Sequence, residues 1–311
     1  LLEQMVNINS HTKNIDGVNR LGNLLWKHLG KLGFTQQIIP QQERGNMLFL
    51  ANSTADSYDV LLLAHLDSSV PFRKQRSCSI TENRIYGTDI WENKGGLAVL
   101  ISSLQALRYI RKLPRLNIGI LLTTDNHTGG KTAKEHILRF ARKSNLVLGL
   151  KGGGINGTAV TSRSGAARYS CQINLEQGTA TEDVPRAVGR FATILSKWTR
   201  LTDESTGVVV TPSDVEISAN ISDVAVRGEA VLSARFNSRE MAETLDKKIH
   251  NIIRTAGKGG FKVQIEGKLR RPPLLKNQKS EKLWQEIKSL ADQADIRLLE
   301  VSALVEKRLF H

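Results

Sequence analysis

The stretch 59–67, DVLLLAHLD, is an apolar run that ends in a histidine and an aspartate. An apolar run without alternating polar residues is typical of a strand buried on both faces of a sheet. The segment 115–125, RLNIGILLTTD, has the same character, and a helical pattern at 93–112 separates the two. Strands that alternate with helices in this way predict an α/β fold with a mainly parallel central sheet and helices on both faces.

The rest of the first half of the chain continues this alternation. Helical spacing covers 1–32 and 132–145, and strands are predicted at 46–52 and 146–151. We therefore expect residues 1–165 to form the first part of an α/β domain.

The pattern changes near residue 165. Alternating polar and apolar residues predict a strand, and the elements after it are a helix, three strands, a helix and a strand, at 168–175, 184–201, 207–217, 219–226, 228–236, 240–257 and 261–267. This order is close to that of a ferredoxin-like α+β domain. We predict that residues 166–270 form such a domain, inserted into the first one. Residues 271–311, with a helix at 280–294, are expected to return to the α/β domain, which then looks truncated.

The net charge of +14, from 44 basic and 30 acidic residues, raises the question of a nucleic-acid partner. Basic clusters at 72–76, 108–112, 139–143 and 268–273 belong to different predicted elements, and no RNA-recognition, zinc-finger or helix-turn-helix pattern accompanies them. A solvated basic surface is the preferred interpretation, and a basic nucleic-acid scaffold is the weaker alternative. No apolar run approaches the roughly 20 residues that cross a bilayer, so no membrane partner is expected.

Polar side chains follow the predicted strands at the points where functional residues of open α/β sheets collect. His65 and Asp67 end the first apolar run, Glu92 precedes the helix, and His127 follows the second run. Two histidines and a carboxylate form a ligand set that zinc takes in catalytic sites. Asp67 is placed to fix the tautomer and orientation of His65. These residues predict a metal site at this edge of the sheet.

The order of these motifs resembles the dizinc hydrolase family of glutamate carboxypeptidase, aminoacylase and succinyl-diaminopimelate desuccinylase. The shared features are His-x-Asp after a buried strand, Tyr-Gly followed by Lys-Gly-Gly, and Asp-x-x-x-Gly after another strand, at 65–67, 86–96 and 125–129. The resemblance covers residues 1 to about 290. It implies a zinc-exopeptidase-like fold whose inserted domain is a lid and dimerisation domain, and hence a homodimer through that lid.

The resemblance also implies roles for the residues at the strand ends. His65 falls on a zinc-binding histidine of the family, and Asp67 on the aspartate that orients it. Glu92 falls on the aspartate that bridges the two metals. His127 falls on a glutamate that binds zinc, a task that a histidine still performs with altered charge.

Other positions depart from the family pattern. Asn126 falls on the glutamate that acts as general base, and an amide cannot accept that proton. Lys151 falls on an acidic metal ligand, and a cation there repels a metal. Glu182 stands where the family has a lid histidine, and His311 has no context that matches the last zinc-binding histidine.

Two lid positions match the family on the substrate side. Asn220 falls on a lid asparagine, and Arg235 on the lid arginine that receives a substrate carboxylate. A guanidinium suits that task because its planar fork pairs with a carboxylate through two hydrogen bonds. With Glu182, these residues are the substrate-binding candidates. An asparagine that closes a turn and an arginine on an exposed strand face are equally favoured interpretations.

The combined losses determine the expected function. Two-metal hydrolysis needs ions roughly 3.5–4 Å apart, and a general base typically contributes about 10²–10⁴-fold. We therefore expect a degenerate family member, weakly active or inactive, that binds at most one zinc ion and no other cofactor. No metal is expected if Lys151 pairs with Glu92 or Asp67. The alternative is an active single-zinc hydrolase of N-acyl amino acids or C-terminal glutamate peptides. In both cases the expected ligand is a small acidic or acylated amino acid or peptide.

Overall fold

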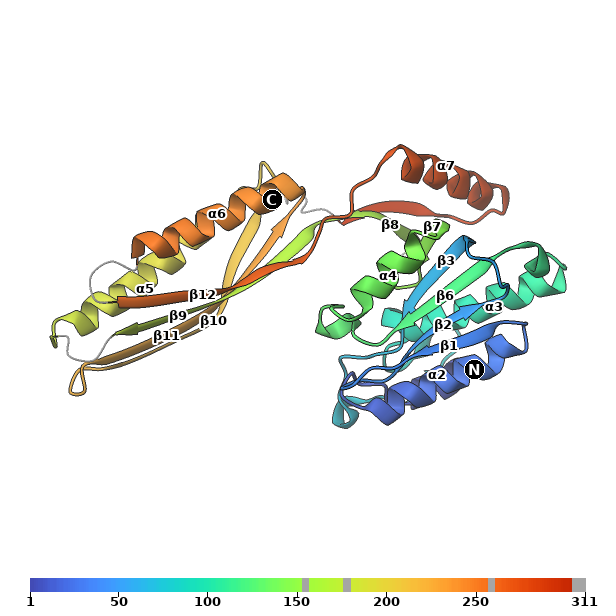
Figure 1. Ribbon diagram of the computed structural model, residues 1–311, viewed down its shortest axis with the longest axis horizontal. Coiled ribbons are helices and arrows are strands. Elements are labelled where there is room, and N and C mark those ends of the chain that lie inside the picture. Colours follow the sequence, from blue (N-terminus) through green and yellow to red (C-terminus); the bar gives the residue numbers. More distant parts are fainter. Residues whose placement is uncertain (153–156, 176–179, 257–260, 304–311) are drawn as a thin grey trace. The chain divides into compact units, whose positions relative to one another are not determined.

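The computed structural model describes residues 1–152, 157–175, 180–256 and 261–303. The chain divides into two compact units, Leu1–Gly152 and Gly153–His311, and each is considered by itself (Figure 1). The predicted boundaries at 166 and 271, and the return of the last segment to the first domain, stay predictions.

The first unit is built on a five-stranded sheet with the order β1-β2-β6-β3-β7. Its strands are β1 (Thr35–Ile39), β2 (Met47–Ala51), β3 (Tyr58–His65), β6 (Ile118–Thr123) and β7 (Ser144–Gly149). Strand β3 is parallel to both β6 and β7, whereas β2 is antiparallel to both of its neighbours. Because only β2 runs against the others, the sheet is mixed, with most strands in one direction.

Helices cover both faces of this sheet, as the sequence predicts. Helices α2 (Ile15–Gly30) and α3 (Gly95–Tyr109) pack on the face that carries Leu50 and Leu122. Helix α4 (Ala133–Ala141) packs on the other face through Phe140, whose ring stacks on Phe49 with 3.7 Å between centroids. Successive side chains of a strand point to opposite faces. Burial of both faces explains why β3 and β6 read as continuous apolar runs.

The N-terminal segment forms two helices instead of the single helix predicted for 1–32. Helix α1 (Leu2–Asn7) is short, and α2 begins after Asn14, whose side chain accepts a hydrogen bond from Gly17 N at 3.1 Å. Asparagine favours such capping positions because its side chain replaces the missing helical acceptor. The loop between the helices runs beside the end of β3, where Ser68 N donates to the Ser10 oxygen and Thr12 N to the Ser68 oxygen.

The second unit contains a four-stranded antiparallel sheet with the order β10-β11-β9-β12. Along the chain its elements are β9 (Gly165–Leu175), α5 (Asp183–Thr199), β10 (Val209–Asn220), β11 (Ala225–Phe236), α6 (Arg239–Ala256) and β12 (Phe261–Arg271). This is the predicted ferredoxin-like order. Helices α5 and α6 bury Phe191, Trp198 and Ile249 against one face of the sheet. The three strands predicted between 207 and 236 are wrong in number, because the structure has two longer strands there.

The remaining elements are short. Strands β8 (Thr158–Arg163) and β13 (Leu299–Ala303) form a parallel pair, and neither was predicted. Helix α7 (Gln278–Gln293) matches the helix predicted at 280–294 and begins with a capping box on Asn277. Strands β4 (Ser79–Ile80) and β5 (Ile85–Tyr86) form a small hairpin in the first unit. Among the described helices, none is long and apolar enough to cross a membrane.

Candidate functional site

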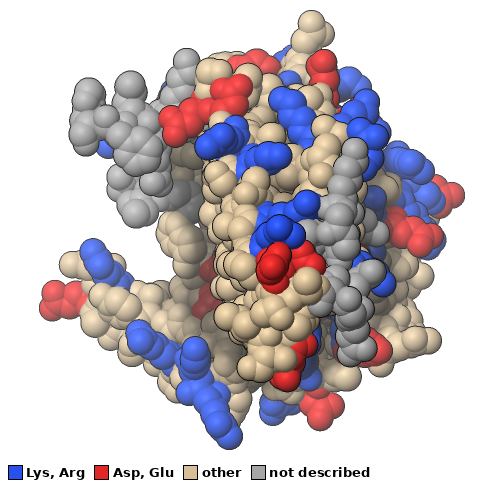
Figure 2. Space-filling model, turned by 90° about the vertical axis from the view of Figure 1, so that its left-hand side faces the viewer, with Lys and Arg blue, Asp and Glu red and all other residues tan. Residues whose placement is uncertain are grey.

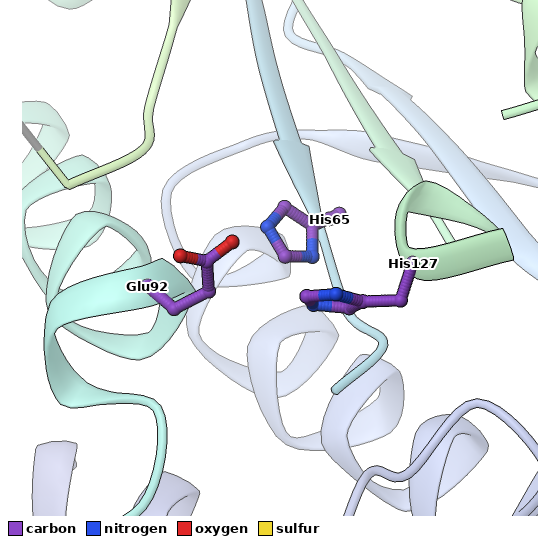
Figure 3. A group of neighbouring side chains, drawn as sticks. All are labelled: His65, Glu92 and His127. Atoms are coloured by element: carbon purple, nitrogen blue, oxygen red, sulfur yellow. The ribbon is translucent and has the colours of Figure 1, made fainter. Parts of the chain in front are cut away.

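The strand ends of the first unit bring the three predicted metal ligands together. His65 ends β3, His127 lies in the turn after β6, and Glu92 lies in the turn before α3. Figure 3 shows their side chains pointing toward one another. One ligand-type atom of each lies within 4.8 Å of those of the other two. The parallel pairing of β3 with β6 produces this meeting, since their carboxyl ends reach the same edge.

His65 is buried and its ring is oriented by Asp67. The Nδ1 atom lies 3.0 Å from the backbone oxygen of Asp67 and 3.3 Å from its carboxylate Oδ1. An Nδ1–H that donates to these oxygens leaves Nε2 with a free lone pair. The amide Nδ2 of Asn126 lies 3.5 Å from that Nε2. The Nε2 lone pair of His65 therefore faces the Asn126 amide.

The carboxylate of Asp67 is fully buried and surrounded by donors. It accepts hydrogen bonds from the backbone N–H of Asn126 and His127, at 3.2 and 3.0 Å, and from the Thr12 hydroxyl at 3.2 Å. Burial raises the pKa of Asp67, but the hydrogen bonds from His65 and from the His127 amide outweigh it, and the pKa lies below its ordinary value. The ionised carboxylate holds the His127 turn against the end of β3.

His127 presents a neutral ring with a free nitrogen. Its ring centroid lies 5.4 Å from that of His65. Burial lowers the pKa of His127, and although Asp67 opposes this effect, the pKa remains below its ordinary value. The Nε2 atom is buried and has no hydrogen-bond partner among the described residues. A neutral imidazole with an unused nitrogen is the form in which histidine binds metals.

Glu92 is carried by a π-helical turn, Ile90–Lys94, that is fastened to the end of β3. The fully buried Asn93 side chain donates to the backbone oxygens of His65 and Asp67, at 3.3 and 3.1 Å. The wider hydrogen-bond ring of a π-turn changes the direction of the side chains, and such turns are frequent at functional sites. The fastening by Asn93 places the Glu92 carboxylate opposite the two histidines.

A buried lysine fixes the same turn to the N-terminal segment. Lys94 is fully buried, and its Nζ donates to the Ile8 backbone oxygen at 2.9 Å and lies 3.9 Å from Asp89 Oδ2. Burial lowers the pKa of Lys94, and the charge of Asp89 opposes that effect only in part. Lys94 therefore ties the turn to Ile8, the residue that follows α1.

Lys151 adds a positive charge beside the predicted ligands. Its Nζ lies 2.7 Å from Glu92 Oε1, and both side chains are partly exposed. Burial raises the pKa of Glu92, but the hydrogen bond and the charge of Lys151 lower it by more, so the pKa lies below its ordinary value. Of the two partners expected for Lys151, the structure pairs it with Glu92.

The comparison with known sequences agrees with this geometry. No protein-family model matches the chain. The chain is 26% identical over 160 residues to carboxypeptidase G2 from Pseudomonas sp. (strain RS-16), an alignment that covers 47% of this chain and 36% of that protein. The chain thus spans about a third of the length of the curated relative that it matches.

Solved structures share the fold over nearly the whole chain. Aminopeptidase PepT from Bacillus cereus ATCC 10987 superposes with a TM-score of 0.76 and 18% identity, covering 97% of this chain and 83% of PepT. The M20 family metallo-carboxypeptidase Sso-CP2 from Sulfolobus solfataricus gives 0.73 and 14%, covering 98% and 85%. Bacillus subtilis YXEP, a dinuclear metal binding peptidase from the M20 family, gives 0.63 and 10%, covering 97% and 82%. The chain therefore shares the fold of these M20 metallopeptidases.

These similarities confirm the fold that the sequence predicted, and they agree with the resemblance seen in its motifs. The sheet of the first unit and the separate antiparallel sheet of the second unit correspond to an M20 fold with an inserted domain. The degenerate character of this chain, the roles of its site residues and the lid-mediated dimer stay predictions.

The predicted substrate-binding residues lie in the second unit. Glu182 is exposed and precedes α5, and Arg235 is exposed on β11. Asn220 ends β10, where its Oδ1 accepts hydrogen bonds from the backbone N–H of Ser222 and Asp223, at 2.9 and 3.2 Å. The interpretation of Asn220 as a turn-closing residue matches this geometry. A substrate role for the three residues stays a prediction.

Three residues that fix the candidate site were not predicted from the sequence. They are Thr12, Asn93 and Lys94, and all are buried polar side chains. The polar run NINSHTKN at 7–14 interrupts the helical spacing and is the signal for a functional loop that contains Thr12. Asn93 and Lys94 stand inside the motif at 86–96, so the sequence indicated this segment but not the roles of the two residues.

Proposed function

We propose that this M20-family chain has a reduced metal centre, which binds at most one divalent cation and hydrolyses peptides or acyl-amino acids slowly or not at all. The observation that carries the proposal is the Lys151–Glu92 ion pair of 2.7 Å. Glu92 stands at the position of the family's metal-bridging carboxylate, and in this chain it is already paired with the positive charge of Lys151.

Electrostatics supports the loss of a second metal position. Two-metal catalysis places two cations roughly 3.5–4 Å apart around a shared carboxylate. In this chain Lys151 already supplies one cation to Glu92, and its charge also acts on His127. A second divalent ion beside the ammonium would face repulsion that a single carboxylate offsets only in part. The Lys151 charge therefore favours one metal or none.

The residue at the position of the general base supports slow hydrolysis. Asn126 places an amide 3.5 Å from His65 Nε2, and an amide nitrogen cannot take a proton from water. Glu92 has a pKa below its ordinary value and is held by Lys151, so it is a weak substitute. The loss of general-base assistance alone typically lowers a rate by about 10²–10⁴-fold.

The remaining donor groups, two imidazoles and a carboxylate, are of the types that bind a zinc ion. His65, Glu92 and His127 would hold it, and the buried Nε2 of His127 without a partner agrees with a ligand role. Zinc bonds of about 2.1 Å in a tetrahedron bring donors to about 3.4 Å from one another, so the group has to contract. A bound ion would polarise the carbonyl oxygen of a ligand. Lys151 opposes the contraction, because it holds Glu92.

Metal content tests this proposal. We expect at most one zinc per chain after zinc loading, and almost none after His127→Ala. The control is His28→Ala, a histidine on α2 outside the group, which should leave the content unchanged. Lys151→Glu, which restores an acid, should raise the zinc affinity at least tenfold. Two tightly bound zinc ions in the unmodified chain would sink the proposal.

A single-zinc hydrolase of N-acyl amino acids or C-terminal glutamate peptides is the second candidate. The His65, Glu92 and His127 group favours it, because the His₂Glu set occurs in catalytic zinc sites. Zinc-dependent turnover of acyl-amino acids or dipeptides, abolished by His127→Ala and retained by His28→Ala, would decide for this candidate. No zinc-dependent turnover would decide for the reduced centre.

A basic nucleic-acid scaffold is the least favoured function. On the face of the molecule drawn in Figure 2, basic side chains occur with acidic ones among them and do not form one continuous patch. Nucleic-acid sites of basic proteins gather Lys and Arg on one face or along one groove. Retention on heparin that falls steeply with salt would revive this function.

A further inference from the structure

A cavity of about 540 Å³ adjoins the predicted metal ligands on the side of α3. Its apolar wall is formed by Tyr86, Trp91, Val99 and Leu150, and Lys151 stands at its polar end. Lys151 is therefore shared between this cavity and the ion pair with Glu92. The size lies within the range of about 300–1,000 Å³ that small-molecule sites occupy.

The apolar wall is unusually exposed. Trp91 and Val99 each retain 59% of their accessible surface, and Tyr86 and Ile85 are also among the exposed large apolar residues. The Trp91 indole N–H has no hydrogen-bond partner within the described part of the chain. Contiguous exposed apolar groups that line a hollow commonly mark a binding site. This wall is a candidate contact surface for an apolar group.

Glycines keep the hollow open. A Cβ on Gly149 would find nothing within 4 Å, so the space beside it is empty. A Cβ on Gly96 would lie 3.0 Å from the Leu150 backbone oxygen, and one on Gly152 would lie 2.2 Å from the Trp91 backbone oxygen. The first turn of α3 and the segment after β7 thus approach through bare backbone, which only glycine permits at such distances.

The wall is also held in a fixed position relative to the ligand group. Trp91 belongs to the π-helical turn that Asn93 fastens to the end of β3 and Lys94 fastens to Ile8. Glu92, the next residue, faces the histidines (Figure 3). A preformed wall of this kind lowers the ordering cost of binding.

The polar end of the cavity offers hydrogen-bond donors. A lysine ammonium carries three N–H donors, and within the described part of the chain Lys151 pairs only with Glu92 Oε1. Its side chain is about half exposed, so a ligand can reach the ammonium. An anionic group can bind there without breaking the ion pair.

We propose that this cavity binds an anionic ligand that carries an apolar group, with the aromatic or aliphatic part against Trp91 and Val99 and a carboxylate on Lys151. The inference deepens the proposed function, because it names the ligand class of the pocket beside the reduced centre. It rests on that function only through the shared Lys151.

A series of simple carboxylates tests the proposal on the full chain without added metal. Acetate, butanoate, hexanoate and 3-phenylpropanoate are titrated by calorimetry and by tryptophan fluorescence. Each added methylene should tighten binding about fourfold. The emission of the exposed Trp91 should shift to the blue, and Trp91→Phe should remove the shift but keep binding within about threefold. Hexanol, which lacks the carboxylate, should bind at least tenfold more weakly than hexanoate.

A matched pair of variants separates the cavity from the general surface. Val99→Asp places a charge on the cavity wall, whereas Leu138→Asp places one on the exposed side of α4. We expect Val99→Asp to lower the affinity for hexanoate at least tenfold and Leu138→Asp to change that affinity less than twofold. Affinity independent of chain length, or equal losses in the two variants, would overturn the proposal. Concentration-dependent self-association that removes the fluorescence shift would overturn it too, because a second copy would then cover the wall.

The two proposals fail in distinguishable ways. Zinc content is measured on the same preparations, and it depends on His65, Glu92 and His127. If two zinc ions bind per protein chain and carboxylate affinity still rises with the length of the alkyl group, the reduced centre is rejected and the cavity proposal is kept. One zinc or none without carboxylate binding would keep the centre and reject the cavity.

Discussion

At the scale of single residues, two carboxylates decide how this site is assembled: Asp67, which is buried, and Glu92, which is partly exposed. Asp67 joins the loop at Thr12, the end of β3 and the turn of His127 through one ionised group. Lys151, whose side chain is half exposed, neutralises the charge of Glu92 through an ion pair. The sequence indicated the orienting role of Asp67 through the His-x-Asp spacing. It gave no sign of Thr12 as a partner, because that contact spans 55 positions of the chain.

Asp67→Asn should weaken both the fold and any metal site. The amide keeps one acceptor oxygen and replaces the other with an N–H₂ group. Because Oδ1 accepts from Asn126 N and Oδ2 from His127 N, one backbone N–H loses its acceptor whichever oxygen is replaced. We expect a loss of about 1–3 kcal/mol in the free energy of unfolding. Zinc affinity should fall about 10–100-fold, since Asp67 orients His65. Urea unfolding and zinc titration measure the two effects.

The control for Asp67→Asn is Asp56→Asn. The Asp56 side chain is exposed, and its one ion pair among the described residues is with Lys143, also exposed, at 3.4 Å. Exposed ion pairs contribute roughly 0–1 kcal/mol, so this variant should unfold almost like the unmodified chain. Equal destabilisation by the two variants would show that Asp67 has no special part in the site.

Cys171 provides a pH-dependent prediction in the second unit. Burial raises the pKa of its thiol from an ordinary value of 9.0 to about 12. A pKa that is higher in the folded state adds stability below pH 9, and this stability is lost as the pH rises through about 12. At pH 9 a thiol reagent should therefore modify Cys78 alone in the native chain and both cysteines in urea. Equal rates for both thiols in the native chain would contradict the burial of Cys171.

At the scale of elements, the structure shows which patterns are informative in the sequence. β3 and β6 were predicted because burial on both faces produces uninterrupted apolar runs. β1 (TQQII) was missed, because it is an edge strand with mostly exposed polar side chains. The two long strands β10 and β11 were read as three, because the turn between them, at 221–224, lies inside the strand predicted at 219–226.

Close packing at the start of α3 leads to a prediction about glycine. Gly96→Ala introduces a Cβ 3.0 Å from the Leu150 backbone oxygen, so α3 has to shift away from the segment after β7. Overpacking of this kind costs about 1–3 kcal/mol of unfolding free energy. Thermal and urea unfolding measure the loss.

Gly189 on α5 is the matched control, because a Cβ there would meet nothing within 4 Å. Gly189→Ala should raise the unfolding free energy by about 0.5–1 kcal/mol, since alanine favours the helical backbone. The two substitutions are chemically identical and should have opposite signs. Stabilisation by Gly96→Ala would show that α3 does not pack as closely as the structure describes.

At the scale of the whole molecule, the two units differ in which of their features could be predicted from the sequence. The ferredoxin-like order of the second unit follows from its elements alone, and the structure confirms it. The functional edge of the first unit was predicted in position, because parallel strands end together. The pairing of Lys151 with Glu92 rather than Asp67 required coordinates, since both carboxylates are close to the same strand ends in the sequence pattern.

The oligomeric state is the prediction that belongs to this scale. The family resemblance implies a dimer through the lid, and β10 is an edge strand of the sheet in the second unit. Its Ile217 side chain is 43% exposed, and an exposed apolar edge strand favours pairing with another chain. Light scattering should give about 69 kDa, twice the 34.4 kDa of one chain. Ile217→Lys should convert the dimer to a monomer.

Strand β12, on the opposite edge of the same sheet, offers the matched variant. Its Leu269 side chain is 42% exposed, so Leu269→Lys adds the same charge at similar exposure. If the dimer forms through β10, only Ile217→Lys lowers the mass. If Leu269→Lys alone dissociates it, the interface lies on the other edge. A monomeric unmodified chain would mean that the lid resemblance does not extend to its assembly.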